Sequence, residues 1–145
     1  MSLPTAVELQ IASAQFPNAG AYFMALYTTI LNVTTAINYS ATGEVAAGGN
    51  YTTKGFAMAV GTFTPDFWGQ SAATAVFDAA DTQSPVASTF TFRSLLVYND
   101  TPTTPLADPG LYFFDAGSNQ IVSNGQLTVI WPTPDSVTGL VRVPQ

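Results

Sequence analysis

The amino-acid sequence predicts an all-β protein, mainly an antiparallel sandwich or partly open barrel of seven or eight short strands. Short runs of aromatic and β-branched residues recur along the chain, and clusters of Gly, Pro, Asn and Asp separate them. With 145 residues, 47% of them hydrophobic, the chain is long enough and apolar enough to bury one core. We therefore expect a single β-rich domain over residues 21–145, preceded by an arm or short helix over residues 1–20.

The N-terminal segment has two interpretations. Pro4 suits a first helical turn, and Val7, Ile11 and Ala14 follow at helical spacing, which predicts a helix over residues 4–15. The rival interpretation is an extended arm.

Seven segments are rich in strand-favouring residues. The predicted strands are residues 21–29, 54–64, 71–77, 90–98, 111–115, 126–131 and 139–143. The segment 90–98 is the most apolar of them, and such a continuous apolar run predicts a strand that is buried on both faces.

The connections are predicted from turn residues. Residues 78–85 read as a turn-rich connection, and residues 116–119 and 123–125 read as tight turns, the latter with an Asn-Gly pair. Residues 31–49 contain few large apolar side chains and predict a long loop, with one helical turn expected at residues 42–47.

The scarcity and sign of the charged residues limit the kinds of partner that we expect. Only 8% of residues are charged, the net charge is −6, and the three cations are Lys54, Arg93 and Arg142. Nucleic-acid binding needs clustered Lys and Arg, so we expect none. Because a free monomer normally carries more charge to stay soluble, a chain with so little charge is expected to cover part of its surface in an oligomer or on a partner.

The residue types also argue against an enzyme. There is no Cys and no His, which removes disulfides, thiolate metal sites and the commonest general base. The carboxylates are scattered, mostly beside turn residues, and the sequence gives no reason to assemble Asp66 with Asp78 or Asp115 into a glycosidase pair. We expect no catalytic residue, no cofactor and no metal.

The start of the chain and its apolar runs bear on where it resides. The first residues lack the pattern of a signal peptide, and no apolar run approaches the ~20 residues of a membrane span. We therefore expect synthesis in a cytoplasm and no membrane partner.

Arg93 stands inside the most apolar predicted strand. One interpretation is that its side chain extends from an edge to water. The other is an ion pair at an interface, with Asp78 or Asp115 as the partner.

An ordered series of short motifs resembles the head decoration, or cement, proteins of tailed bacteriophages. The series is Tyr22-Phe-Met-Ala-Leu-Tyr27, Glu44-Val-Ala-Ala-Gly-Gly-Asn-Tyr51, Phe77-Asp78, Phe92-Arg-Ser-Leu-Leu-Val-Tyr-Asn99, Phe113-Phe-Asp-Ala-Gly117, Gly125-Gln-Leu-Thr-Val-Ile-Trp-Pro132 and Leu140-Val-Arg-Val143. It covers roughly residues 21–143, whereas residues 1–20 and 101–110 depart from the pattern.

The resemblance implies a β-rich virion structural protein made in the host cytoplasm and placed on the outer capsid surface. Such a protein binds the major capsid protein and holds neighbouring capsid subunits together, often as a homotrimer. The residues that we expect at the capsid or inter-subunit interface are Leu3, Val7, Ile11, Phe16, Arg93 and Asp108.

The alternative function is a tail, fibre or vertex module that binds host surface carbohydrate. Sugars stack on exposed aromatic rings, and Trp68, in an aromatic turn, with Tyr51 is the candidate platform. Packing in a core or an interface is the other interpretation of these aromatic residues.

Overall fold

The chain folds into antiparallel sheets, in a computed structural model that describes residues 20–32, 34, 38–59, 74–77, 79–101, 106–131 and 141–144. For residues 74–77 and 141–144 only the backbone is described. The described residues contain no helix, and the all-β antiparallel prediction is confirmed. Their strands are β1 (Tyr22–Tyr27), β2 (Phe56–Ala57), β3 (Thr74–Phe77), β4 (Thr82–Gln83), β5 (Ser88–Asn99), β6 (Gly110–Gly125), β7 (Thr128–Val129) and β8 (Val141–Pro144).

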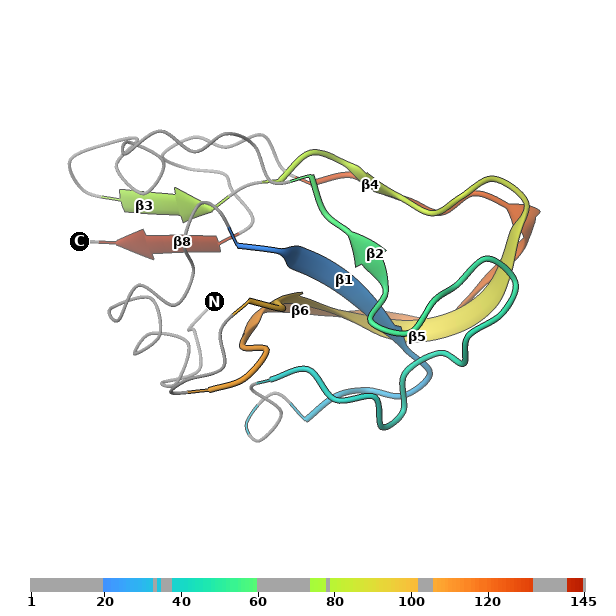
Figure 1. Cartoon of the computed structure of the whole chain (residues 1–145), viewed down its shortest axis with the longest axis horizontal. Helices are drawn as coiled ribbons and strands as arrows, with labels where there is room; N and C mark the ends of the chain where they lie inside the picture. Colours follow the sequence, from blue (N-terminus) through green and yellow to red (C-terminus); the bar gives the residue numbers. More distant parts are fainter. Residues whose placement is uncertain are drawn as a thin grey trace.

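A four-stranded sheet of order β2-β1-β5-β6 forms the main layer of the molecule. Two small two-stranded sheets, β3-β8 and β4-β7, lie on one side of it, and the connection between β1 and β2 runs along the other (Figure 1). All of the strand pairs are antiparallel. Strand β1 and the C-terminal half of β5 are therefore covered on both faces.

The larger core lies between the main sheet and the β4-β7 sheet. Met24 and Leu26 of β1 and Leu95 and Val97 of β5 point into it, each at most 3% exposed. Trp131, after β7, closes it from the opposite layer and donates its indole N–H to the hydroxyl of Thr82 (3.0 Å). This hydrogen bond joins the end of β7 to β4.

A second, smaller core lies on the other face of the same sheet. Ala25 and Tyr27 of β1 meet Leu96 and Tyr98 of β5 there, and Leu31 and Tyr39 of the β1–β2 connection pack over them. Successive residues of a strand point to opposite faces, so a run such as Leu95–Leu96–Val97 fills both cores. The prediction that this strand is buried on both faces is confirmed over Ser94–Asn99.

On the N-terminal side of Ser94, the β1–β2 connection no longer covers the outer face of the β5–β6 hairpin. Phe90 and Phe92 remain in the larger core, whereas Thr89 and Thr91 between them are exposed. This half of the sheet has one buried face and one solvent-facing face, which is the usual state of an antiparallel sheet.

Several predicted boundaries are corrected by the structure. The strand predicted at residues 111–115 continues to Gly125, so the turn predicted at residues 116–119 is wrong. The connection predicted at residues 78–85 contains the short strand β4. Residues 42–47 form a turn without a helix. Of the strand predicted at residues 54–64, residues 54–59 are described, and only Phe56–Ala57 of them form a strand, β2. The helix or arm predicted at the N-terminus lies outside the described residues.

A β-bulge explains the missing turn. Phe92 pairs with Gln120 and Ser94 with Asp115, so β6 advances five residues where β5 advances two. The three additional residues of β6 are accommodated around Gly117, whose φ of 78° suits glycine. Gly117 therefore correctly indicated a left-handed backbone position. That position belongs to a bulge, however, and the chain does not reverse its direction there.

Candidate interface and the polar network beside it

The outer edge of β6 is the main unpaired backbone of the described sheet. β5 pairs with one side of β6, and no described residue pairs with its other side. Edge strands are usually short or protected by Lys or Pro, because a row of free N–H and C=O groups accepts further strands. β6 has sixteen residues with no Lys, Arg or Pro, whereas β2, at the opposite edge, has two residues. The β6 edge is therefore the candidate interface.

Apolar side chains are exposed along this edge strand. Phe114 is 48% exposed and Ile121 is 75% exposed. They lie in the two regular stretches of β6, residues 112–115 and 120–122, that flank the bulge at Gly117. A strand added to β6 would thus find hydrogen-bonding groups and apolar contacts in the same two places.

The only charge on β6 is neutralised within the chain. Arg93 Nε donates to Asp115 Oδ1 (2.6 Å), and Arg93 Nη2 donates to Asp115 Oδ2 (3.2 Å). The backbone N–H of Gly117 also donates to Asp115 Oδ1 (2.9 Å). The Arg93 guanidinium and then the Gly117 N–H hold the pKa of Asp115 below its usual range. The β6 edge consequently presents no unbalanced charge to a partner.

Arg93 thus has one of its two predicted partners, and Asp78, the other, lies outside the described residues. The side chains of Arg93 and Asp115 are 24% and 31% exposed, so the pair lies at the surface of the hairpin. The ion pair is formed within one chain. A contact of Arg93 with another subunit stays a prediction.

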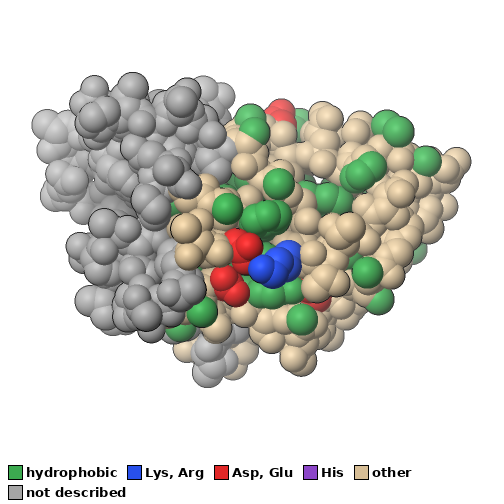
Figure 2. Space-filling model, in the orientation of Figure 1, with side chains coloured by type: hydrophobic (Ala, Val, Ile, Leu, Met, Phe, Trp, Pro, Cys, Tyr) green, Lys and Arg blue, Asp and Glu red, His purple; other side chains and the backbone are tan. Residues whose placement is uncertain are grey.

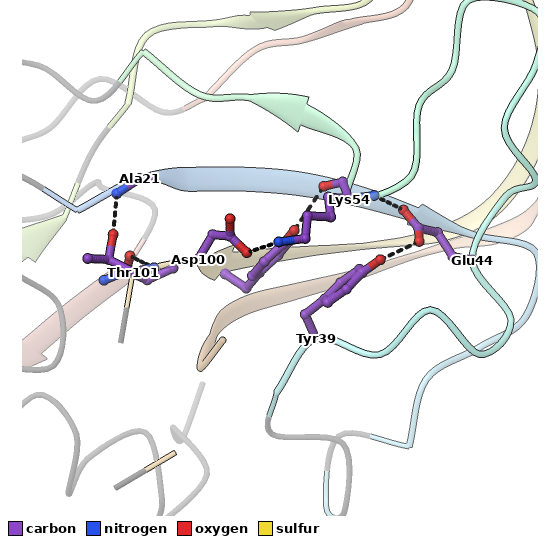
Figure 3. A network of polar contacts seen from close by, with 8 residues as sticks. Ala21, Tyr39, Glu44, Lys54, Asp100 and Thr101 are labelled. Carbon is purple, nitrogen blue, oxygen red and sulfur yellow. Dashed lines mark hydrogen bonds and ion pairs between the residues drawn. The ribbon is translucent and has the colours of Figure 1, made fainter. Parts of the chain in front are cut away.

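A second polar feature joins the two cores, because it links Tyr39 of the smaller core to Tyr51 of the larger one. Glu44 accepts hydrogen bonds from the hydroxyl of Tyr39 (2.6 Å), the hydroxyl of Tyr51 (2.7 Å) and the backbone N–H of Lys54 (2.8 Å). Figure 3 shows the side chain of Tyr39 and the backbone of Lys54 converging on this carboxylate from different parts of the β1–β2 connection. Glu44 therefore fixes the path of that connection over the sheet.

Tyr51 links the same carboxylate to the main sheet. Its hydroxyl oxygen accepts from the backbone N–H of Leu26 in β1 (2.9 Å) while its proton goes to Glu44. The side chain is 2% exposed, and its ring makes edge contacts with Phe56 and Phe90. Burial, followed by the hydrogen bond to Glu44, raises the pKa of Tyr51 above its usual range.

Lys54 is held at three points. Its N–H donates to Glu44, its carbonyl accepts from the hydroxyl of Tyr98 (3.1 Å), and its ammonium group lies 2.7 Å from Asp100. Its φ of 79° lies in the left-handed region, where a side chain is disfavoured, so these contacts offset backbone strain. The hydrogen bond to Asp100 raises the pKa of Lys54.

Asp108 lies beside this ion pair. Partial burial, and then the negative charge of Asp100, raise the pKa of Asp108 above its usual range. Its carbonyl accepts from the backbone N–H of Tyr39 (2.8 Å), which ties the β5–β6 loop to the β1–β2 connection. Figure 2 shows acidic and basic side chains together near the middle of this face, with hydrophobic side chains beside them. A partner contact of Asp108 stays a prediction.

Of the remaining predicted site residues, the structure describes only Tyr51. Tyr51 is buried, so it offers no exposed ring face to a sugar in this structure. Trp68, its predicted companion, lies outside the described residues, as do Leu3, Val7, Ile11 and Phe16. The carbohydrate platform therefore gains no support from Tyr51.

Sequence reasoning missed the Glu44 network and the β6 edge. Tyr39 and Tyr51 flank Glu44 at separations of five and seven residues, but nothing in that spacing indicates that both hydroxyls reach one carboxylate. The edge was hidden by the false turn at residues 116–119, since two short strands present less free backbone than one long strand. The scarcity of charge between residues 110 and 125 was the available signal.

The described ranges offer neither a metal site nor a membrane-spanning helix. Within them, no group of three or more His, Cys, Asp or Glu side chains is placed to hold a metal ion. The same ranges contain no helix with the length and apolar character needed to span a bilayer.

Over the described residues, fold and site together define an all-β protein with a long sheet edge whose single carboxylate, Asp115, is paired with Arg93. Comparison with protein-family models, with curated proteins and with solved structures finds no match for this chain.

Proposed function

We propose that this chain is a virion structural protein of a tailed bacteriophage, a decoration or cement protein that binds the outer surface of the capsid. It would stabilise contacts between neighbouring copies of the major capsid protein, and it would act as a homo-oligomer, with a trimer as the expected state. Binding that favours the assembled shell stabilises that shell by mass action, and many copies on a symmetric lattice add avidity.

The observation that carries the proposal is the ordered series of motifs between residues 21 and 143. The fold is compatible with it, because three of those motifs, residues 22–27, 92–99 and 113–117, fall on the neighbouring strands β1, β5 and β6 of the main sheet. The long β6 edge supports a role in assembly, since it offers a partner both backbone hydrogen bonds and the exposed side chains of Phe114 and Ile121.

The first test is the number of copies of this chain per virion. Quantitative mass spectrometry of purified virions would give its abundance relative to the major capsid protein. Near-stoichiometric copies are expected for a shell decoration protein. A few copies per particle would contradict the proposal and favour the alternative, a tail or vertex module that binds host carbohydrate.

The second test concerns the segment of residues 1–18, which we propose as an arm that reaches a neighbouring subunit. Deleting it should weaken binding to undecorated shells at least tenfold, or about 1.4 kcal/mol, while the β domain stays folded. Co-sedimentation with shells measures the affinity, and circular dichroism checks the fold. Unchanged affinity would show that the arm has no part in binding.

A further inference from the structure

We infer that the outer edge of β6 accepts residues 7–11 of a neighbouring copy of this chain as an added β-strand. The inference deepens the proposed arm, and it concerns contacts between copies of this protein without the shell. Two independent observations carry it, one on the sheet and one in the sequence.

The observation on the sheet is the free edge itself. No described residue pairs with the outer side of β6, and its two regular stretches, residues 112–115 and 120–122, each carry an exposed apolar side chain. The occupant that such an edge recognises is an extended polypeptide with little charge, because β-addition combines main-chain hydrogen bonds with contacts of alternate side chains.

The observation in the sequence is a strand pattern in the segment before β1. Residues 7–11 read Val-Glu-Leu-Gln-Ile, so Val7, Leu9 and Ile11 alternate with two polar residues. Alternation of this kind places all three apolar side chains on one face of a strand, whereas Val7 and Ile11 alone would also fit a helix. Pro4 and Pro17 bracket the segment and limit the length of backbone that can pair.

The charges of the two segments are compatible. Glu8 is the only charged residue among residues 1–19, and Asp115 is the only one on β6. Since Arg93 already binds Asp115, the two segments can approach without a pair of free carboxylates facing each other. No unpaired carboxylate of β6 therefore opposes this contact.

The reach of the segment allows it to leave its own subunit. Tyr22 pairs with Asn99 and Gly110 pairs with Tyr98, so β1 and β6 begin at the same end of the sheet. Residues 12–21 connect the proposed strand to β1, and ten extended residues span roughly 35 Å. Each copy would give its segment to the next copy, a head-to-tail contact that forms a ring, such as a trimer, when the rotation between copies closes.

Cross-linking of single-cysteine variants tests the contact directly, because the native chain has no cysteine. Purified full-length Leu9→Cys is mixed with ¹⁵N-labelled full-length Ile121→Cys, and a short bismaleimide is added. Ile130→Cys serves as the matched control, because Ile130 is 76% exposed and Ile121 is 75% exposed, and Ile130 lies outside β6. A thiol held beside another by strand pairing has an effective concentration in the millimolar range, so we expect at least about tenfold more mixed dimer with Ile121→Cys than with the control.

Three results would overturn the inference. One is equal cross-linking of both pairs, and another is the absence of mixed dimer. The third is cross-linking of a Leu9→Cys/Ile121→Cys double variant only within one chain, which would place the segment on its own subunit.

A measurement of mass gives an independent answer. By light scattering, the full-length protein is expected to be an oligomer and the Ile121→Lys variant a monomer of 15.2 kDa, whereas Ile130→Lys should keep the oligomer. Circular dichroism verifies that both variants are folded. A monomeric native protein, or an Ile121→Lys variant that stays oligomeric, would contradict the contact. Because no shell is present, these results leave the decoration role to be decided by copy number.

Discussion

At the scale of single residues, hydrogen-bond satisfaction decides which polar side chains matter for stability. Glu44 accepts from Tyr39, Tyr51 and the backbone of Lys54, and all three donors belong to the β1–β2 connection, part of which covers the smaller core. A carboxylate with three donors fixes loop geometry because each donor would lose its partner if the loop moved. The network therefore acts as the clamp of the β1–β2 connection.

The two tyrosines of this clamp differ in a testable way. Tyr51→Phe leaves the buried N–H of Leu26 without an acceptor and removes one donor from Glu44, so we expect a loss of about 1–3 kcal/mol in the free energy of unfolding. Tyr39→Phe is the matched control, since it removes one donor to the same carboxylate at a partly exposed site. Urea denaturation measures both. Equal losses would show that the hydrogen bond from Leu26 contributes nothing.

Asp108 and Asp115 should respond to pH in opposite directions. The pKa of Asp115 is lowered by Arg93, so its contribution to stability is present above the unfolded pKa and is lost as pH falls through the folded value. The pKa of Asp108 is raised, so its contribution is present below the unfolded pKa and is lost as pH rises through the folded value. At neutral pH, ionised Asp108 is therefore unfavourable.

Asparagine at each position separates the two effects. Relative to the native protein, Asp108→Asn should become more stable as pH rises from 3 to 7, and Asp115→Asn should become less stable over the same range. Asparagine suits position 108, whose φ is 48°. Because Asp108 is largely solvated, its change should stay below about 1 kcal/mol. Thermal unfolding at a series of pH values measures both slopes, and slopes of the same sign would contradict the assignment.

At the scale of elements, β5 changes character along its length. Its C-terminal half fills a core on each face of the sheet, whereas its N-terminal half has exposed threonines between buried phenylalanines. The difference comes from the β1–β2 connection, which covers only the C-terminal half of β5. Which residues of β5 are buried on both faces therefore depends on where the β1–β2 connection covers the strand, and not on the strand sequence alone.

Adjacent leucines of β5 test this assignment. Leu95 and Leu96 are each 3% exposed and face opposite cores, so Leu95→Ala and Leu96→Ala should each cost about 2–5 kcal/mol of unfolding free energy. Thr91→Ala, at an exposed position of the same strand, should change it by less than about 0.5 kcal/mol. Chemical denaturation measures all three. A small loss for Leu96→Ala alone would mean that the connection does not pack on the sheet.

At the scale of the whole molecule, the scarcity of charge predicts how binding responds to salt. The chain has three cations and nine carboxylates, and two of the cations, Lys54 and Arg93, are paired with carboxylates inside the chain. Association driven by strand pairing and apolar contact is screened little by salt. The proposed assembly should therefore be held mainly by uncharged contacts.

A salt titration tests this expectation. Between 50 and 500 mM NaCl, the dissociation constant of the protein from undecorated shells should change by less than about threefold. Co-sedimentation with purified shells gives the constant at each concentration. A steep increase with salt would show that charged contacts dominate the binding to the shell.

Much of the fold could be predicted because local patterns carry it. Aromatic and β-branched runs located β1, β5 and β8, and the apolar run at residues 90–98 predicted a burial on both faces that the structure shows over Ser94–Asn99. The turn at residues 116–119 was wrong because Gly117 has the same left-handed backbone in a bulge as in a turn, and only the partner strand distinguishes the two. Of the candidate site, sequence reasoning named Asp115 as a partner for Arg93 but could not place β6 at a sheet edge.

The sequence by itself determined the all-β class, the order of the strands along the chain and the scarcity of charge, since propensity, periodicity and composition are local properties. Only the tertiary structure decided which side chains meet: Tyr39 and Tyr51 on Glu44, Lys54 beside Asp100, and β6 at an open edge. These contacts depend on strand order and register within the sheets. Register couples residues far apart in the chain, so no local pattern specifies it.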